Sequence, residues 1–380
     1  MAFEFATATR IVFGAGKLAE LPSVLRDIGA SRVLVVTGKS TERAAKISEL
    51  VDAAAFVSVA GEPTIELARD GVATVAAHGC DAVVAFGGGS ALDAGKAIAV
   101  LAANGGDPLD YLEVIGRGRP IAKPSLPFIA IPTTAGTGSE VTKNAVLASK
   151  QERVKASLRS PNMLPRVAIV DPDLLRGAPS DVLASSGLDA LSQVVEPFVS
   201  NRANPITDAL AREGMKRSAR SLRRAVLEDA DADAREDLAL TSLLGGLCLA
   251  NGGLGAVHGF AAPVGGTFEA PHGAVCAALL ASAFDVNLRA IRERGTPALL
   301  ERFDEVARIV TGDQAARAAD AVTFFESLRR DLAIPGLARY GMRGSDVDAI
   351  VAKAKVASSM KANPIALTDA ELIEIARRAL

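Results

Sequence analysis

Histidine is scarce in this chain of 380 residues, and two of its three histidines lie close together. His258 and His272 occur in the short segment VHGFAAPVGGTFEAPHG. Neutral imidazole is the commonest protein metal ligand near pH 7, so a spaced pair is typical of a metal site. A single buried histidine is more often an ordinary core residue. The pair therefore indicates a metal centre in this segment.

Two glycine-rich segments have the composition of phosphate-binding loops. The first, GGGSALDAGK at 87–96, begins with Gly87, Gly88 and Gly89. Glycines let the backbone approach a phosphate closely and leave N–H groups free to bind its oxygens. Ser90 and Asp93 fit a capping box at the start of the next helix, whose positive end favours an anion.

The second glycine-rich segment is PTTAGTGSE at 132–140. It supplies hydroxyl groups from Thr133, Thr134 and Thr137, which suit a pyrophosphate or a ribose. Both segments follow apolar runs, so each is expected at the end of a strand.

The first half of the chain predicts a parallel sheet covered by helices. Residues 3–13 alternate as a strand or hairpin should. Buried strands are expected at 32–36, 55–59, 81–86, 127–131 and 167–171. Helical stretches lie between several of them, at 41–51, 64–78 and 90–103. Continuous apolar runs separated by helices are typical of parallel sheets, which bind ligands at the carboxyl ends of their strands.

After Pro179 the strand pattern disappears and helical periodicity takes over. Helices are expected at 181–200, 205–227, 234–257, 274–292, 298–311, 313–331, 345–359 and 368–379. We therefore expect an α/β nucleotide-binding domain over 1–178 and an all-helical domain over 179–380.

Composition excludes several classes of function. A net charge of −2 gives no overall positive potential that would attract nucleic acid or an anionic membrane surface. No uninterrupted apolar run approaches the roughly 18 residues that a membrane span requires. The three widely spaced cysteines are expected to be reduced core thiols. The first residues lack the basic and apolar regions of a signal peptide. We expect a soluble cytoplasmic protein.

The order of the motifs resembles the iron-containing (group III) alcohol dehydrogenase family. GGGSALDAGK and PTTAGTGSE are followed by GLDALSQVVEPF and then by the histidine segment. The resemblance extends from FGAGKLAEL at 13–21 to SSMKANPIALTDAEL at 358–372. It implies the two-domain fold shared with dehydroquinate synthases, and hydride exchange between NAD or NADP and an alcohol–aldehyde pair.

The resemblance also implies roles for particular residues. Gly88, Gly89 and Ser90 would contact the cofactor pyrophosphate. Lys155 would bind the nicotinamide ribose. The path of the adenosine ribose and the nicotinamide would be lined by Thr133, Thr134, Thr137 and Val146.

The family binds a divalent metal, iron or zinc, through one aspartate and three histidines. Asp189, His258 and His272 match three of these positions. The fourth is Gln193, one helical turn after Asp189, and its amide oxygen is a weaker ligand than imidazole. Ala262 stands where many relatives have a proton-relay histidine, which leaves the proton route to water or the cofactor ribose.

The expected function is therefore an NAD(P)-dependent alcohol dehydrogenase or aldehyde reductase. The alternative within oxidoreductases is an enzyme like maleylacetate reductase, with weak or no metal dependence. The segment GGTFEAPHG resembles that branch of the family locally. A lyase of the dehydroquinate synthase type and a nucleotide-binding protein without turnover also remain open.

Two further expectations concern the cofactor and the assembly. Gly38 and Lys39 follow the strand at 32–36, where relatives that favour NAD often carry aspartate; without that carboxylate, NADP should be accepted. The alternating segment 3–13 should pair in a homodimer or a larger even-numbered assembly.

Overall fold

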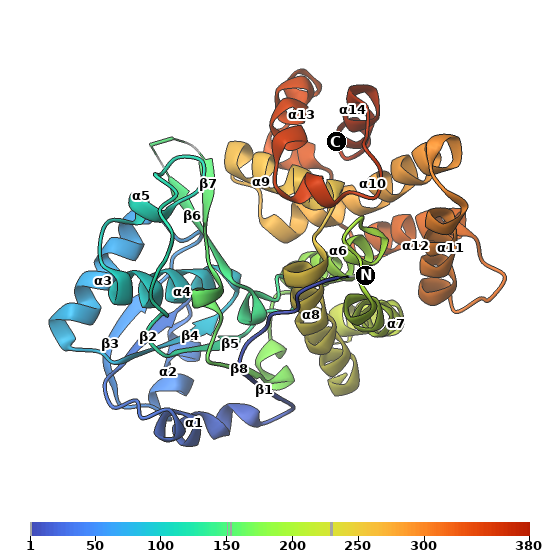
Figure 1. Cartoon of the computed structure of the whole chain (residues 1–380). Helices are drawn as coiled ribbons and strands as arrows, with labels where there is room; N and C mark the ends of the chain where they lie inside the picture. Colours follow the sequence, from blue (N-terminus) through green and yellow to red (C-terminus); the bar gives the residue numbers. More distant parts are fainter. Residues whose placement is uncertain (1, 150, 153, 229–230) are drawn as a thin grey trace. The chain divides into compact units, whose positions relative to one another are not determined.

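A computed structural model describes residues 2–149, 151–152, 154–228 and 231–380 (Figure 1). Contacts within the chain group it into two compact units. The α/β unit comprises Phe5–Thr134 and Gly138–Arg176. The helical unit comprises Gly177–Leu380, together with Ala135–Thr137 and the residues before Phe5. The helical unit therefore includes a short part of the second glycine-rich segment.

The α/β unit is built on a six-stranded parallel sheet, as predicted. Its strand order is β1-β8-β5-β4-β2-β3. The strands are β1 (Arg10–Phe13), β2 (Val33–Thr37), β3 (Ala53–Ser58), β4 (Ala82–Gly87), β5 (Phe128–Pro132) and β8 (Val167–Val170). A separate antiparallel hairpin consists of β6 (Asn144–Ser149) and β7 (Val154–Arg159).

Helices cover both faces of this sheet, which explains its continuous apolar strands. Val33 and Val35 pack in a core with residues of α1 and α2, whereas Leu34 and Val36 pack in a second core with residues of α3 and α4. Figure 1 shows these two helix pairs on opposite sides of the strands. The helices are α1 (Leu21–Asp27), α2 (Thr41–Ser48), α3 (Ile65–His78), α4 (Gly89–Asn104) and the short α5 (Pro108–Tyr111).

This unit differs from the sequence expectation in two places. Residues 3–9 have no regular structure, and β1 pairs in parallel with the distant β8 rather than forming a hairpin with its neighbours. The β6–β7 hairpin was missed because small and polar residues weaken its alternating pattern. One face of β6 is nevertheless buried, at Ala145, Leu147 and Ser149.

The described residues of Gly177–Leu380 contain helices and no strand, as predicted. The α-helices are α6 (Ser180–Val199), α7 (Pro205–Leu227), α8 (Ala232–Gly252), α9 (Ala256–Phe268), α10 (His272–Arg294), α11 (Pro297–Thr311), α12 (Ala318–Asp331), α13 (Val347–Val356) and α14 (Asp369–Arg378). The single helix expected at 234–257 is divided, because Gly253 adopts a left-handed φ of 72°. The chain bends there by 100°, and α9, which was not predicted, follows.

The helix α10 is central to this unit. It is long and apolar enough to cross a membrane by length and composition, and the bent pair α8 and α9 passes the same test. However, 89% of the apolar window of α10 is buried inside the protein. Burial of this kind is typical of a core helix in a globular protein.

Candidate functional site

Three loops meet at the carboxyl ends of neighbouring strands in the α/β unit. The strand order reverses between β2 and β4, since β3 lies on one side of β2 and β4 on the other. Open α/β sheets bind ligands at such a switch point. The loops after β2, β4 and β5 carry the three groups of candidate cofactor residues.

These loops touch one another. The backbone N–H of Thr133 donates to the carbonyl oxygen of Gly87 at 2.9 Å. A Cβ atom on Gly88 would lie 3.2 Å from Oγ1 of Thr134. One on Gly87 would lie 3.4 Å from the backbone nitrogen of Gly38 and only 2.6 Å from Cβ of Ala91. Five of the predicted cofactor residues are therefore brought together, namely Gly38, Gly87, Gly88, Thr133 and Thr134. The close approach explains why glycine is needed at 87 and 88.

The start of α4 differs from the predicted capping box. The helix begins at Gly89 with Gly88 as its N-cap, and no side chain caps it. The Asp93 carboxylate instead accepts hydrogen bonds from Oγ of Ser139 at 2.5 Å and from the backbone N–H of Val146 at 2.9 Å. Asp93 thus anchors the second glycine-rich segment and β6 to α4. Ser90 is half-buried in the first turn.

A fully buried lysine strengthens this anchor. Nζ of Lys96 donates to the carbonyl oxygen of Ser139 and to Oγ1 of Thr142, both at 2.9 Å, and lies 3.4 Å from Asp93. Burial lowers the pKa of Lys96, while the nearby carboxylates oppose that effect. Burial also raises the pKa of Glu140 to about 7. The loop is therefore fixed by a buried network of polar and charged groups.

The remaining candidate cofactor residues have different surroundings. Lys155 on β7 forms an ion pair with Glu62 at 2.9 Å. A Cβ atom added to Gly38 would have no neighbouring heavy atom within 4 Å, and Lys39 beside it is exposed. Thr137 is half-buried and groups with the helical unit.

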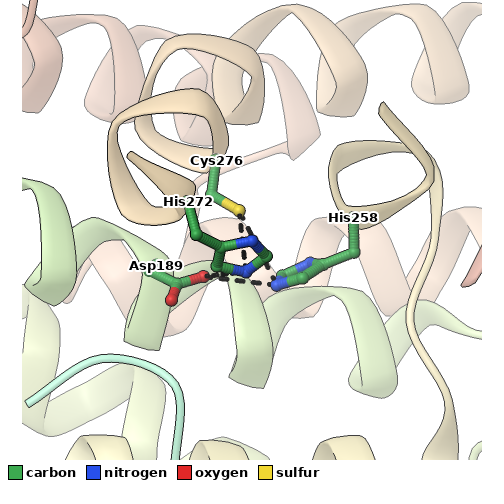
Figure 2. A group of neighbouring side chains, drawn as sticks. All are labelled: Asp189, His258, His272 and Cys276. Atoms are coloured by element: carbon green, nitrogen blue, oxygen red, sulfur yellow. Dashed lines mark hydrogen bonds and ion pairs between the residues drawn. The ribbon is translucent and has the colours of Figure 1, made fainter. Parts of the chain in front are cut away.

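In the helical unit, four side chains converge in the way that a metal ion requires. Asp189 comes from α6 and His258 from α9, while His272 and Cys276 come from successive turns of α10 (Figure 2). One ligand atom from each residue lies within 4.8 Å of all the others. The sequence predicted the first three, but Cys276 was expected to be an ordinary core thiol. Its position four residues after His272 places both on one helix face and was an available signal.

The distances within this cluster are short. Oδ1 of Asp189 lies 3.2 Å from Nε2 of His258 and 3.7 Å from Nε2 of His272. Sγ of Cys276 lies 3.7 Å from Nε2 of each histidine. Asp189 is only 1% exposed, so water cannot compensate its charge. A buried carboxylate of this kind needs a cation beside it.

Glu196, which the sequence analysis missed, orients His258 from the other side. Its Oε2 lies 2.7 Å from Nδ1 of His258, and its Oε1 accepts the backbone N–H of Val257 at 2.7 Å. The contact directs Nε2 of the imidazole toward Asp189. A carboxylate behind a ligating histidine is a common feature of metal sites. Glu196 lies two helical turns after Asp189 on α6, so helical spacing offered a signal.

The charged groups around the cluster also favour a bound cation. Burial alone lowers the pKa of His272, but Cys276 and Asp189 outweigh it and raise that pKa to about 9. The pKa of His258 likewise stands well above its usual value, because Cys276, Asp189 and Glu196 outweigh burial. Burial raises the pKa of Asp189, but His272 and His258 lower it more. Negative neighbours thus raise the pKa of both imidazoles, as expected of a pocket that attracts a cation.

Gln193 presents a free oxygen in the same part of the fold. Its Nε2 donates to the carbonyl oxygen of Gly136 at 2.8 Å, while its Oε1 is buried without a hydrogen-bond partner. Buried oxygens are rarely left unpaired. Gln193 lies one helical turn after Asp189 on α6, which keeps it a candidate ligand beside the four clustered donors. The remaining histidine, His78, is exposed at the end of α3 in the other unit.

Comparison with known proteins places the chain in a family. Residues 8–172 match the model of iron-containing alcohol dehydrogenase, and residues 183–380 match the C-terminal model of the Fe-containing alcohol dehydrogenase family. An NAD-dependent methanol dehydrogenase from Bacillus methanolicus is 35% identical over 383 residues, covering 97% of each chain.

Solved structures agree with this result. A 1,3-propanediol oxidoreductase superposes with a TM-score of 0.92 at 31% identity, covering 100% of both chains. A maleylacetate reductase from Agrobacterium tumefaciens has a TM-score of 0.80 at 27% identity, covering 100% of this chain and 98% of that one. The chain belongs to the iron-containing alcohol dehydrogenase family, whose members are oxidoreductases that act on CH–OH donors with NAD and a divalent metal.

Proposed function

We propose that this protein is an NAD(P)-dependent alcohol dehydrogenase or aldehyde reductase with a divalent metal in the Asp189 cluster. The convergence of Asp189, His258 and His272 carries the proposal, because these residues come from three different helices. Packing alone does not require two imidazoles and a carboxylate to meet in a buried place.

Each part of the chain has a separate task in this reaction. When bound, the metal supplies a Lewis acid that polarises the substrate oxygen, and the nicotinamide cofactor exchanges the hydride. Asp189, His258 and His272 hold the metal, and Glu196 fixes the ring orientation of His258. Gln193 adds its free amide oxygen as the weakest donor.

The glycine-rich loops bind the cofactor in this proposal. Backbone N–H groups of Gly88, Gly89 and Ser90 at the start of α4 suit the negative pyrophosphate. The segment from Thr133 to Thr137 supports the ribose and nicotinamide portions. Asp93 acts indirectly, because its carboxylate is already occupied in holding Ser139 and Val146.

Turnover with defined substrates tests the proposal. Purified protein is incubated with NADH or NADPH and either a panel of small aldehydes or maleylacetate. We expect aldehyde reduction that chelation abolishes and added Zn²⁺ or Fe²⁺ restores. Turnover of maleylacetate alone, unaffected by chelation, would instead establish the alternative oxidoreductase. Cofactor binding without any turnover would establish a nucleotide-binding protein.

We propose further that the enzyme accepts NADP. Gly38 provides no carboxylate at the end of β2 to repel a 2′-phosphate, and the exposed Lys39 beside it supplies positive charge. Fluorescence titration with both reduced cofactors tests this proposal. Binding of NADH with no binding of NADPH would contradict it.

We also propose that the protein is a cytoplasmic homodimer or a larger even-numbered assembly. β1 is an edge strand of the sheet, so one side of it is open to a second copy. The three cysteines are free, which suits a reducing compartment. A monomer in light scattering at micromolar concentration would contradict the proposed assembly.

A further inference from the structure

Cys276 differs from the other two cysteines because its sulfur lies beside two candidate metal ligands, the imidazoles of His258 and His272. Its Sγ lies 3.7 Å from Nε2 of both His258 and His272. Cys248 is equally buried, but its Sγ lies 3.5 Å from a backbone carbonyl oxygen, that of Thr207. Figure 2 shows the sulfur of Cys276 directed toward the imidazoles.

The distances around Cys276 match those of a tetrahedral metal site. With bonds of about 2.3 Å to sulfur and about 2.0 Å to nitrogen, a tetrahedral zinc ion holds these donors about 3.5 Å apart. The two sulfur–nitrogen distances here are both 3.7 Å. Nitrogen and oxygen donors should lie about 3.3 Å apart, and Asp189 lies 3.2 and 3.7 Å from the two imidazoles. A metal ion therefore fits between the four residues with small side-chain adjustments.

The chemistry of the donors points in the same direction. The site has two imidazoles. The Gln193 side chain offers only its amide oxygen, because its amide nitrogen already donates to the carbonyl oxygen of Gly136. A thiolate is a far stronger ligand than an amide oxygen for zinc. Resting on the proposed function, we propose that Cys276 is the fourth strong metal ligand of this chain, which gives an Asp–His–His–Cys site that favours zinc over iron.

Cys276 then takes the place of Gln193 as the fourth ligand, so the metal keeps four protein ligands. Zinc sites can expand to five-coordination when a substrate oxygen enters, so a fourth protein donor does not prevent catalysis. The thiolate also changes the selectivity of the site, because soft sulfur ligands favour zinc over the harder ferrous ion.

Cobalt substitution tests the sulfur bond directly. Chelated protein is loaded with saturating Co²⁺, the bound cobalt is quantified, and the near-ultraviolet spectrum is recorded. We expect a sulfur-to-cobalt charge-transfer band in the wild type and in the control Cys248→Ser. We expect the band to be absent from Cys276→Ser at equal cobalt content. Cobalt bound to the wild type without that band would overturn the inference and leave the proposed function intact.

Zinc affinity provides an independent measurement. Loss of an outer-shell partner typically costs 10–100-fold in metal affinity, so loss of a direct thiolate ligand should cost at least about 100-fold. Cys248→Ser should bind zinc as the wild type does. Adding Gln193→His to Cys276→Ser should recover much of the affinity without restoring the charge-transfer band, because an imidazole then replaces the sulfur.

The outcomes separate the two proposals. Equal zinc affinity in wild type and Cys276→Ser, with both proteins folded by circular dichroism, would overturn the role of Cys276 alone. Failure of the wild type to bind either cobalt or zinc would contradict the proposed metal centre itself, and this inference with it.

Discussion

Replacing Glu196 by glutamine should weaken metal binding although no metal ligand is itself replaced. The Glu196 carboxylate accepts two hydrogen bonds at 2.7 Å, one from Nδ1–H of His258 and one from the backbone N–H of Val257. An amide of the same size has a single oxygen acceptor. In Glu196→Gln one of the two donors must therefore face an NH₂ group.

The size of the effect follows from that lost bond. A hydrogen bond to a charged group contributes about 1.5–3 kcal/mol. At 1.4 kcal/mol per factor of ten, its loss corresponds to roughly 10–100-fold in affinity. This range agrees with the measured cost of removing carboxylates behind ligating histidines. We therefore expect the dissociation constant for Zn²⁺ to rise by about one to two orders of magnitude.

Competition with a chromophoric zinc chelator measures this change. Glu213→Gln is a suitable control, since Glu213 is a partly exposed partner of Arg217 on α7, and the variant should bind zinc as the wild type does. Circular dichroism shows whether each variant is folded. A folded Glu196→Gln protein whose zinc affinity is within twofold of the wild type would refute the orienting role of Glu196.

Three further variants test other parts of the structure. Gln193→His should bind zinc more tightly in chelator competition, because it places an imidazole one turn after Asp189; unchanged affinity would contradict this. The pKa of Glu140 is raised from 4.5 to about 7. Its contribution to the free energy of unfolding is therefore fully present below pH 4.5 and is lost as the pH rises through 7. The total change is about 3 kcal/mol. Urea unfolding at pH 5 and 8 should show this loss in the wild type and not in Glu140→Gln. Gly95→Ala should lose about 1–3 kcal/mol by the same method, because its Cβ would lie 2.7 Å from that of Ala85; full stability would contradict the packing.

Much of the fold could be predicted because its signals are local. The strands of the parallel sheet are uninterrupted apolar runs, and the helix at 205–227 is bounded by an Asn204 capping box and by polar residues at its end. The wrong predictions arose where distant contacts decide. β1 is a strand because Arg10–Phe13 pairs with Val167–Val170, more than 150 residues away, which no local pattern reveals.

The candidate site was predictable only in part for a similar reason. Asp189, His258 and His272 are residue types that attract attention in a sequence. Cys276 and Glu196 look like ordinary residues of apolar helices, and their roles depend on how α6, α9 and α10 pack against one another. Asp93 shows the opposite error, since its helix-start position predicts a cap whereas the folded chain uses it to hold the neighbouring loop.

The dependence of activity on metal occupancy shows whether the reaction needs a metal held by Asp189, His258 and His272. Aldehyde reduction is measured in protein of known metal content, as purified, after chelation, and after refilling with Zn²⁺ or Fe²⁺, alongside His272→Ala. We predict that activity rises in proportion to occupancy and that His272→Ala is nearly inactive. Full activity in demonstrably metal-free protein, or in His272→Ala, would contradict it.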